Sequence, residues 1–533
     1  MSSAPEGVGG RRGGTASPRS VVVVGSGAAG LAAAVAAAQR GAAVTLLERS
    51  RYLGGTTALS GGVAWLPANA WSEAPDSVDD ALTYLRGISL GDVQPDLVEV
   101  FVRDSRRVAD RIVETTDVRW WALDYPDYHA DRPGARHGGR SLEPHPIEAP
   151  QEFSARLVPP KSWRLPVTQH EVLTGRLGRA EIERRQRDGT LTMGRALVGG
   201  LLRGAERAGV HVRSGVRARR LLRDGDTVVG VDTDDGPFFG RVMLACGGFE
   251  RDEALVRAFL RAPTPGVTGA PGNTGDGLRM ALSVGAALGN MSEAWWAPTM
   301  RVPGDELEGA PLYRLILNER AWPGSILVDS RGRRFVDEAQ NYNDLGRALH
   351  SFDPVTFSFP RERSWLVFDA AYRRRYHLGH LLRDDPDPEW LPRADDLAGL
   401  AARIGVPADA LVATVERFNE LADRGEDVDF GRGAGTYDRY IGDARAPHPT
   451  LGALRTPPFY AVRVHPGTLG TKGGPRTDAD GRVLHVDGGV VPGLYAAGNA
   501  AANPFGYAYP GAGGTIGPAL VFGTRAGDAA ACD

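Results

Sequence analysis

Cysteine is nearly absent from this 533-residue sequence, which contains only Cys246 and Cys532 and no CxxC pair. A disulfide-stapled secreted scaffold needs many cysteines, and a pyridine-nucleotide disulfide reductase needs a redox-active pair. Both classes are therefore excluded. The sequence also has no HExxH motif and no Cys/His cluster with the spacing of metal ligands. We predict no metal site.

Lysine is equally scarce, because only Lys161 and Lys472 accompany the arginines among 62 basic residues. With the high alanine and glycine content, we interpret this as codon bias and not as an anion-binding device. The formal net charge is -3, and 42% of the residues are hydrophobic. This composition is typical of a globular protein and favours neither a nucleic acid nor an anionic membrane as partner. The length predicts two or three domains.

An uninterrupted membrane span is also missing. Residues 21–38 are apolar enough to imitate one, but Gly25, Ser26, Gly27 and Gly30 break the run. Arg11-Arg12 resembles the start of a twin-arginine signal, yet the only apolar segment after it is this same run, which could not be cleaved away. We therefore predict no transmembrane segment, a disordered tail over residues 1–19 and a cytoplasmic location.

The segment Val21–Glu48 is the strongest motif in the chain. Four valines predict a buried strand, and the Gly25–Gly30 turn, GSGAAG, leads into an alanine-rich helix and a second strand ending at Glu48. Gly25 supports the tight turn, Gly27 allows a pyrophosphate to approach the backbone, and Gly30 lets the helix lie close to the strand. Glu48 stands where a carboxylate binds a ribose hydroxyl. The unit predicts dinucleotide binding, with the phosphates at the N-terminus of the helix.

Further glycine segments along the chain indicate that the dinucleotide is FAD. They lie at residues 54–62, 246–248, 273–277 and 494–517. An NAD-linked dehydrogenase that used only Val21–Glu48 would leave them unexplained. The predicted cofactor-binding residues are Gly25, Gly27, Ala28, Ala29, Gly30, Glu48, Arg49, Gly54, Gly55, Thr56, Thr57, Ser60, Gly61, Gly62, Gly247, Gly248, Asn273, Asp276, Gly498, Asn499, Gly514, Thr515 and Ile516.

The order of these segments predicts an α/β fold in which a Rossmann-like FAD-binding domain is discontinuous. Its first part covers residues 20–300 and its second part residues 467–533. Between them, residues 301–466 combine strand-like and helical segments and predict an inserted α+β catalytic domain that caps the substrate. Val212–Ala218, Arg220–Arg223 and Val228–Thr233 predict a β-meander within the first part.

Taken together, the motifs resemble the fumarate reductase/succinate dehydrogenase flavoprotein superfamily. GSGAAG with Glu48, GGTTALSGG, NTGDG, GRRFVDEA, GTKGG and LYAAGN occur in the order of that superfamily. Within it, the chain is most similar to the 3-ketosteroid Δ1-dehydrogenases. That similarity rests on the segments at residues 125–128 (YPDY), 338–342 (EAQNY) and 509–513 (YPGAG), and the resemblance covers the chain from about residue 18 onward.

The resemblance implies a role for each of four catalytic residues. Tyr342 would remove a proton from carbon 2 of a 3-keto ring, and Tyr128 would support it. The hydroxyl of Tyr509 and the backbone N–H of Gly513 would hold the carbonyl oxygen, and flavin N5 would accept a hydride from carbon 1. The resemblance leaves the natural electron acceptor open.

Physical chemistry agrees with such an arrangement. A C–H bond beside a carbonyl loses its proton only if the developing enolate is stabilised, and two donors at the carbonyl oxygen do this. Tyrosine has a reference pKa of about 10, so a tyrosine base needs a neighbouring donor or positive potential, which would explain a tyrosine pair. A helix beginning near Thr515 would direct its positive end at the flavin. Tyr507 is expected on the cavity wall, whereas Trp120, Trp121, Trp295 and Trp296 could face a sterol or pack in the core.

The sequence departs from the dicarboxylate-handling members in two places. Succinate dehydrogenases carry a histidine near the first glycine loop that bonds covalently to FAD, whereas this chain has Thr56-Thr57-Ala58-Leu59-Ser60. We therefore expect non-covalent FAD. The stretch comparable with their histidine-containing carboxylate clamp is residues 468–474, TLGTKGG, without a histidine. An uncharged cyclic ketone of steroid-like shape is expected as substrate.

Two alternatives remain open at this stage. The chain could be a flavin desaturase or ene-reductase of the same fold that acts on another polycyclic ketone or natural product. It could also bind flavin without turnover, although a binding role would not require the set Tyr128, Tyr342, Tyr509 and Gly513.

Overall fold

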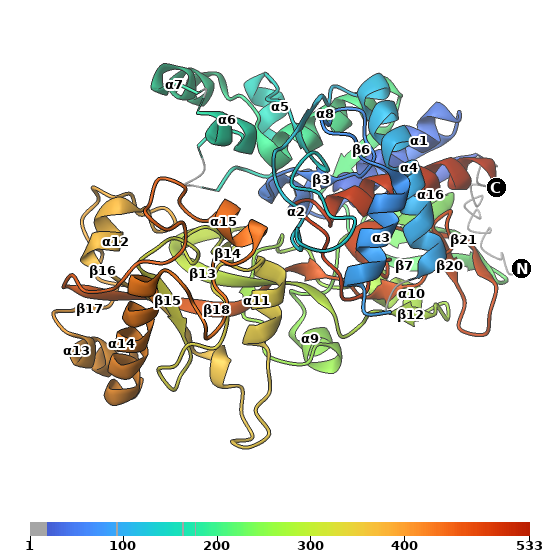
Figure 1. Ribbon diagram of the computed structural model, residues 1–533. Coiled ribbons are helices and arrows are strands. Elements are labelled where there is room, and N and C mark those ends of the chain that lie inside the picture. The colour runs from blue at the N-terminus through green and yellow to red at the C-terminus, as the bar shows by residue number, and fades with distance from the viewer. Residues whose placement is uncertain (1–18, 92–93, 162–164, 176) are drawn as a thin grey trace, which may run out of the picture.

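The computed structural model describes residues 19–91, 94–161, 165–175 and 177–533. The tail predicted for residues 1–19 lies outside the described residues except for Arg19. Two units are visible, and each is built on its own sheet (Figure 1). The unit that carries both ends of the described chain contains the Val21–Glu48 segment.

The first sheet has six strands in the order β20-β21-β10-β1-β2-β6. Parallel pairing joins β1 to both β2 and β10, β2 to β6, and β10 to β21, and only β20 runs antiparallel. The strands are β1 (Ser20–Val24), β2 (Ala43–Glu48), β6 (His211–Ser214), β10 (Arg241–Leu244), β20 (Arg482–Leu484) and β21 (Val490–Ala496). Strands from both ends of the chain thus complete one parallel sheet, as the discontinuous Rossmann-like fold predicts.

One part of the predicted β-meander was wrong. His211–Ser214 pairs with β2 in the main sheet, and the meander consists of β7 (Ala218–Asp224), β8 (Thr227–Thr233) and β9 (Gly236–Phe239). The difference arises because the edge of β2 has unpaired backbone N–H and C=O groups with which His211–Ser214 can pair. No local sequence pattern indicates this pairing.

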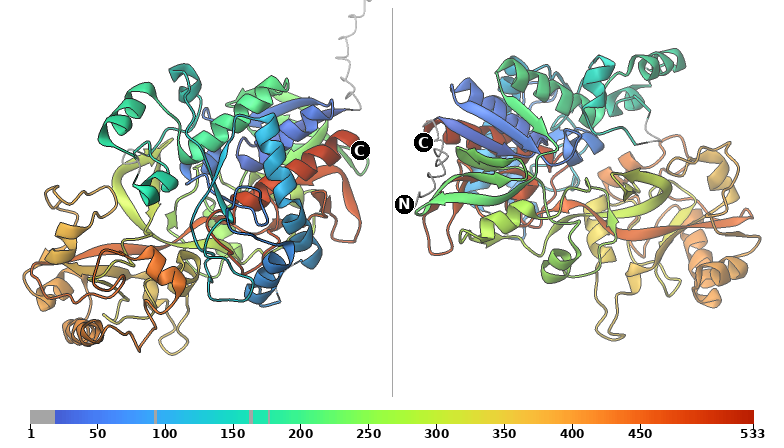
Figure 2. Two further views of the ribbon diagram at one scale, coloured as in Figure 1. Left: turned by 45° about the horizontal axis from the view of Figure 1, so that its top comes forward. Right: turned by 180° about the vertical axis from the view of Figure 1, so that it is seen from behind.

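The last helix packs on the first. An added Cβ at Gly523 or Gly527 of α16 (Ile516–Cys532) would lie 2.5 Å from the carbonyl oxygen of Ala29 and 2.2 Å from that of Ala33 in α1 (Ala28–Gln39). Glycine therefore permits a backbone approach that side chains would prevent. The blue and red helices lie together in Figure 2. The other helices of this unit include α3 (Val78–Ile88), α4 (Pro95–Thr115) and α8 (Met193–Arg207).

Smaller elements connect these layers. Strands β3 (Ala64–Trp65), β5 (Ser141–Pro144) and β4 (Trp120–Ala122) form a three-stranded sheet, and β12 (Leu288–Gly289) pairs with β19 (Gly474–Pro475). The short helices are α2 (Gly55–Leu59), α5 (Gln151–Ala155), α6 (Gln169–Thr174), α7 (Arg179–Asp188), α9 (Glu253–Phe259) and α10 (Asp276–Leu282). Over the described ranges, none of the helices has the length and apolar character needed to cross a bilayer.

The second sheet follows the order β14-β13-β18-β16-β15, with β11 and β17 also paired to β18. Its strands are β11 (Gly266–Val267), β13 (Ala294–Leu307), β14 (Ala310–Leu315), β15 (Ser325–Val328), β16 (Ser364–Asp369), β17 (Arg393–Ala394) and β18 (Phe459–Thr471). Helices α11 (Tyr342–Leu349), α12 (Ala370–Arg375), α13 (Leu397–Ile404), α14 (Ala408–Arg424) and α15 (Thr436–Ile441) surround it. Residues 301 and 467, where we divide the chain, lie within β13 and β18, and the domain division stays a prediction.

Candidate active site

A cavity of ≈ 380 Å³ extends from the glycine turn after β1 to a group of tyrosines contributed by both units. Its wall includes Gly25 and Glu48 from the first sheet, Leu315 from the second, and Tyr342 and Tyr509. The predicted cofactor segment and the predicted catalytic residues therefore share one cavity.

The glycine turn has the geometry that its sequence predicts. Gly25 has φ +110°, and a Cβ there would lie 2.4 Å from the carbonyl oxygen of Ala245. A Cβ at Gly30 would lie 1.9 Å from the carbonyl oxygen of Gly25, so only glycine lets α1 begin this close to the strand. At Gly27 the nearest atom would be 3.4 Å away, which leaves the backbone accessible from the cavity.

Glu48 reaches the cavity wall at the end of β2. Its Oε2 accepts hydrogen bonds from the backbone N–H of Ser26 at 3.1 Å and from its hydroxyl at 2.7 Å, and Oε1 accepts from the backbone N–H of Ser50 at 3.0 Å. Burial raises the pKa of Glu48, while these hydrogen bonds favour the carboxylate. The hydroxyl of Ser26 also accepts from the N–H of Gly54 at 2.8 Å. Ser26 thereby joins Glu48 to the glycine-rich loop, a role that the sequence analysis missed.

Arg49 ties the end of β2 to the segment before α10. Its Nη1 donates to the carbonyl oxygen of Gly272 at 3.0 Å and the hydroxyl of Thr274 at 2.6 Å, and lies 3.2 Å from the carboxylate of Asp276. Arg217 binds the same carboxylate at 2.6 Å. Both Arg49 and Asp276 line the cavity, and Arg217 was not predicted.

Most predicted cofactor-binding residues lie on the cavity wall. They are Gly25, Gly27, Ala28, Ala29, Glu48, Arg49, Gly55, Thr56, Thr57, Ser60, Gly61, Gly62, Gly247, Asn273, Asp276, Gly498, Asn499, Thr515 and Ile516. Gly30, Gly54, Gly248 and Gly514 are not on that wall. Each allows close packing behind it: a Cβ at Gly54 would lie 2.9 Å from Ala58, at Gly248 2.1 Å from Thr471, and at Gly514 2.8 Å from the ring of Tyr509.

These walls fit FAD by their own chemistry. The open backbone at Gly27 and the start of α1 suit a diphosphate, and the Glu48 carboxylate suits a ribose hydroxyl. At the other end, Thr515 and Ile516 at the start of α16 line the cavity, so the positive end of that helix dipole is directed there. Among the described residues, no cluster of His, Cys, Asp and Glu is arranged to hold a metal ion.

Three predicted catalytic tyrosines meet in the cavity. The hydroxyl of Tyr342 donates to that of Tyr509 at 2.7 Å, and the ring of Tyr128 packs edge-on against both, with centroid distances of 5.3 and 5.2 Å. Burial raises the pKa of Tyr342 and Tyr128 well above the usual range. Burial also raises the pKa of Tyr509, to about 12, although hydrogen bonds from Tyr342 and Thr515 act in the opposite direction.

Gly513 occupies a position that only glycine can fill. It has φ +94°, and a Cβ there would lie 2.5 Å from the backbone nitrogen of Trp65 and from the carbonyl oxygen of Val63. Its own carbonyl oxygen accepts from the N–H of Trp65 at 3.0 Å. This contact holds the Tyr509–Gly513 segment against β3, with Gly513 on the cavity wall.

Buried polar residues connect the loops that carry Tyr128 and Tyr509. The carbonyl oxygen of Pro510 accepts from the N–H of Tyr128 at 3.0 Å and from the hydroxyl of Tyr84 at 2.6 Å. Asp127 accepts from Nε1 of Trp65 and from Arg140, both at 2.7 Å. Burial raises the pKa of Asp127 to about 6, opposed by the charge of Arg140. Tyr84, Trp65 and Arg140 were missed, since only folding brings them beside the YPDY motif.

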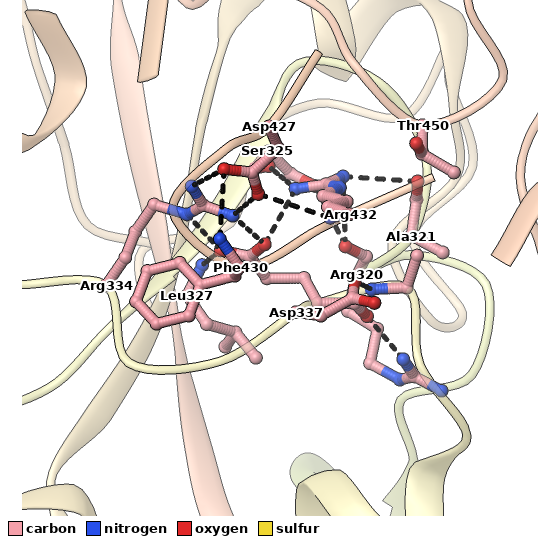
Figure 3. A network of polar contacts seen from close by, with 12 residues as sticks. Arg320, Ala321, Ser325, Leu327, Arg334, Asp337, Asp427, Phe430, Arg432 and Thr450 are labelled. Atoms are coloured by element: carbon pink, nitrogen blue, oxygen red, sulfur yellow. Dashed lines mark hydrogen bonds and ion pairs between the residues drawn. The ribbon is translucent and has the colours of Figure 1, made fainter. Parts of the chain in front are cut away.

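A second network fixes the segment that leads into Tyr342 (Figure 3). Arg320 donates to the carbonyl oxygens of Glu338 and Gln340, the latter at 2.7 Å. The buried carboxylate of Glu338 pairs with Arg334 at 2.7 Å and Arg432 at 3.2 Å. Tyr342 then begins α11, whose N-terminus is capped by the side chain of Asn341.

Other aromatic expectations had mixed outcomes. Tyr507 is not on the cavity wall, and its hydroxyl accepts from Arg261 at 3.3 Å. None of Trp120, Trp121, Trp295 and Trp296 lines the cavity: Trp120, Trp295 and Trp296 are buried in the core, and Trp121 stacks on His145 and His170. Tyr125 does line it, together with the unpredicted Lys161, Gln169 and Arg314.

Comparisons with known proteins agree with this geometry. A family model described as FAD binding domain matches residues 20–516. The chain is 41% identical over 533 residues to 4-oxocyclohexanecarboxylate 2-dehydrogenase of Sinomonas cyclohexanicum, covering 96% of this chain and 93% of the relative. It is 40% identical over 550 residues to 3-oxosteroid 1-dehydrogenase of Mycobacterium tuberculosis, covering 94% and 96%.

A solved structure is also similar over nearly the whole chain. The crystal structure of 3-ketosteroid Δ1-dehydrogenase from Sterolibacterium denitrificans, in complex with 1,4-androstadiene-3,17-dione, superposes with a TM-score of 0.90 at 34% identity, covering 96% of this chain and 100% of that one. These findings confirm the predicted fold class and FAD as cofactor. The chain belongs to the FAD-binding domain family and, within it, to the FAD-dependent oxidoreductases of the 3-ketosteroid Δ1-dehydrogenase type.

Proposed function

We propose that this enzyme introduces a double bond next to the carbonyl of a cyclic ketone, between carbons 1 and 2 of a 3-ketosteroid. The observation that carries the proposal is the meeting of Tyr342, Tyr509 and Tyr128 in the same cavity as the glycine turn. FAD, when bound, supplies the hydride acceptor.

Proton removal from carbon 2 is assigned to Tyr342, with Tyr128 beside it. Because burial raises the pKa of Tyr342, its phenolate needs stabilisation from a neighbour when the proton leaves the substrate. A side-chain hydrogen bond with Tyr128 lowers the pKa of Tyr342 and so favours the phenolate, whereas the hydrogen bond that Tyr342 donates to Tyr509 raises this pKa. In the alternative arrangement, the base is Tyr509, which accepts the hydrogen bond from Tyr342.

The hydroxyl of Tyr509 and the backbone N–H of Gly513 are proposed to donate hydrogen bonds to the carbonyl oxygen of the substrate. Two donors at this oxygen stabilise the enolate that forms as the proton leaves carbon 2. The buried surroundings of Tyr509 exclude water and strengthen these interactions. Tyr509 accepts the hydrogen bond from Tyr342, and its own O–H is the donor proposed for the ketone oxygen.

A second candidate substrate class is a small cyclic ketone bearing a carboxylate. Two observations favour it: the relative from Sinomonas cyclohexanicum is named for 4-oxocyclohexanecarboxylate, and Lys161 and Arg314 contribute cationic side chains to the cavity wall. Arg314 also pairs with Glu319 at 2.5 Å. A steroid would instead use the apolar wall formed by residues such as Leu307, Leu315 and Leu317.

Anaerobic mixing of the FAD-loaded enzyme with a ketone panel tests both candidates. The panel includes 4-androstene-3,17-dione and 4-oxocyclohexanecarboxylate, and bleaching of the flavin absorbance reports oxidation of the ketone. Turnover with phenazine methosulfate as electron acceptor confirms catalysis. Bleaching by the steroid alone supports the first candidate, and bleaching by the carboxylate alone supports the second. If neither bleaches the flavin but the reduced enzyme consumes 1,4-androstadiene-3,17-dione, the enzyme works as an ene-reductase.

A further inference from the structure

Lys472 is a fully buried cation directly after β18, with an exposed fraction of 0%. Its ammonium group donates to three consecutive backbone carbonyl oxygens: those of Gly506 at 2.9 Å, Tyr507 at 3.3 Å and Ala508 at 3.0 Å. These residues immediately precede Tyr509. Burial of a charge is costly unless it is paired or hydrogen-bonded, so this cage of carbonyl oxygens specifies the path of the segment.

The same ammonium group also contacts an aromatic ring that packs against Tyr509. It lies 4.3 Å from the ring centroid of Trp295, which in turn lies 4.8 Å from the ring of Tyr509. Nε1 of Trp295 donates to Asn499 at 3.0 Å, a residue of the cavity wall. Lys472 therefore acts on the backbone before Tyr509 and on a ring beside it.

The helix that carries Tyr342 also holds this segment. Arg347 of α11 donates to the carbonyl oxygen of Tyr507 at 3.1 Å, and its guanidinium lies 4.7 Å from the ring centroid of Tyr507. Lys472 and Arg347 thus donate to the same carbonyl oxygen, that of Tyr507. The hydrogen bond between Tyr342 and Tyr509 is a further contact between α11 and the segment that ends at Tyr509.

Lysine is chemically suited to this site, whereas arginine is not. Three carbonyl oxygens converge on one atom, and an ammonium group directs three N–H bonds from a single nitrogen. A planar guanidinium spreads its donors over three nitrogens and is larger. In a chain where arginine replaces lysine at nearly every basic position, Lys472 is one of only two lysines.

From these contacts we infer that Lys472 is a positioning residue, which holds the hydroxyl of Tyr509 at the reacting carbonyl without touching the substrate. The inference rests on the proposed function for its kinetic readout. Lys472→Met keeps the apolar stem but loses the charge and donors. The rate of anaerobic flavin reduction by the active ketone is expected to fall by up to ~100-fold, the loss produced by misplacing a reacting group by about 1 Å.

Two comparisons separate positioning from a general loss of structure. Lys472→Arg restores the charge but not the geometry, so its rate is expected to stay near that of Lys472→Met. In a Tyr509→Phe background, Lys472→Met is expected to cause no further loss, since the group that it positions is gone. Equal losses in both backgrounds would overturn the inference.

Arg373→Met is the matched control. Arg373 is also a buried cation that donates to backbone carbonyl oxygens, those of Leu382 at 2.8 Å and Asp385 at 2.9 Å, but it lies in α12 and does not line the cavity. Its removal is expected to lower thermal stability while leaving the rate of flavin reduction unchanged.

A spectroscopic readout keeps the inference testable even if no ketone reduces the flavin. With 3-fluorotyrosine installed at position 509 of the FAD-loaded protein, the ¹⁹F resonance is expected to shift or broaden in Lys472→Met and to stay unchanged in Arg373→Met. An unchanged resonance in Lys472→Met would overturn the positioning role. Failure of the proposed function would appear separately, as absent flavin bleaching in the unsubstituted enzyme.

Discussion

The hydroxyl of Tyr342 donates a hydrogen bond to the hydroxyl of Tyr509, with 2.7 Å between the two oxygens. The two residues are 167 positions apart and come from different units of the chain. Tyr342 is the first residue of α11 beside the second sheet, while Tyr509 lies in the segment just before α16 of the FAD-binding unit. The candidate active site is therefore assembled at the contact between the two units.

The first prediction concerns Tyr342. Tyr342→Phe removes the proposed base, so we expect flavin reduction by the active ketone to slow by ~100- to 10,000-fold, the usual contribution of a general base. Stopped-flow absorbance under anaerobic conditions measures the rate. Tyr440→Phe is the control, because the hydroxyl of Tyr440 is buried without a hydrogen-bond partner among the described residues. A normal rate in Tyr342→Phe would transfer the role of base to another residue, with Tyr509 as the first candidate.

Gly513 supplies the second prediction. Gly513→Ala would place a Cβ 2.5 Å from backbone atoms of Val63 and Trp65, in addition to its positive φ. We expect poor FAD retention and a lower melting temperature, measured by flavin absorbance and thermal unfolding. Gly489→Ala provides the control, since Gly489 has φ +73° but no atom within 4 Å of an added Cβ. Its cost should stay near the roughly 1–2 kcal/mol of a left-handed alanine. Equal losses in the two variants would show that backbone strain, and not the contact with β3, explains the glycine.

A third prediction concerns pH and the acidic residues at the end of the second network. Burial, followed by the charge of Asp438, raises the pKa of Asp337 to about 8. An unfolded aspartate has a pKa of about 3.9, so the folded protein binds more protons between these values. The free energy of unfolding should therefore fall as pH rises from about 4 to about 8.

Urea unfolding at pH 5 and pH 8 measures this dependence. Asp337→Asn, which cannot ionise, should reduce the difference between the two pH values. Asp226→Asn should leave it unchanged, because the side chain of Asp226 is 98% exposed and its partner Arg223 keeps its charge at both pH values. A steeper dependence in Asp337→Asn would contradict the assigned direction.

The fourth prediction concerns the buried ion pairs around Glu338. Glu338→Gln removes the negative charge that pairs with Arg334 and Arg432. The site is buried, since the side chains of Glu338 and Arg432 have exposed fractions of 0%. Breaking a buried pair typically costs about 3–5 kcal/mol, which we expect in the free energy of unfolding. Glu420→Gln, at an exposed pair with Arg417, should cost less than ~1 kcal/mol. A loss below that of Glu420→Gln would show that the network does not stabilise the loop before Tyr342.

The cofactor-binding turn was predictable from sequence because its constraints are local. Gly25, Gly27 and Gly30 lie within six residues: Gly25 and Gly30 allow a backbone conformation or an approach that Cβ would prevent, and Gly27 leaves its backbone accessible from the cavity. Glu48 follows at the end of the next strand, a spacing that one strand–helix–strand unit fixes. The predicted catalytic residues were located through motifs that resemble a known family, and their roles stay a proposal.

Local patterns in the sequence were enough to predict the FAD-binding turn and the parallel sheet completed from both ends of the chain, and to exclude a disulfide-stapled scaffold and a redox-active cysteine pair. The contacts that hold the tyrosines became visible only in the folded chain. Trp65, Tyr84 and Arg140 support the loops of Tyr128 and Tyr509 through contacts far apart in sequence, and Lys472 stands out only when its three carbonyl partners are seen. Short motifs record local backbone needs, whereas the partners of a buried polar group are set by packing, which no local pattern encodes.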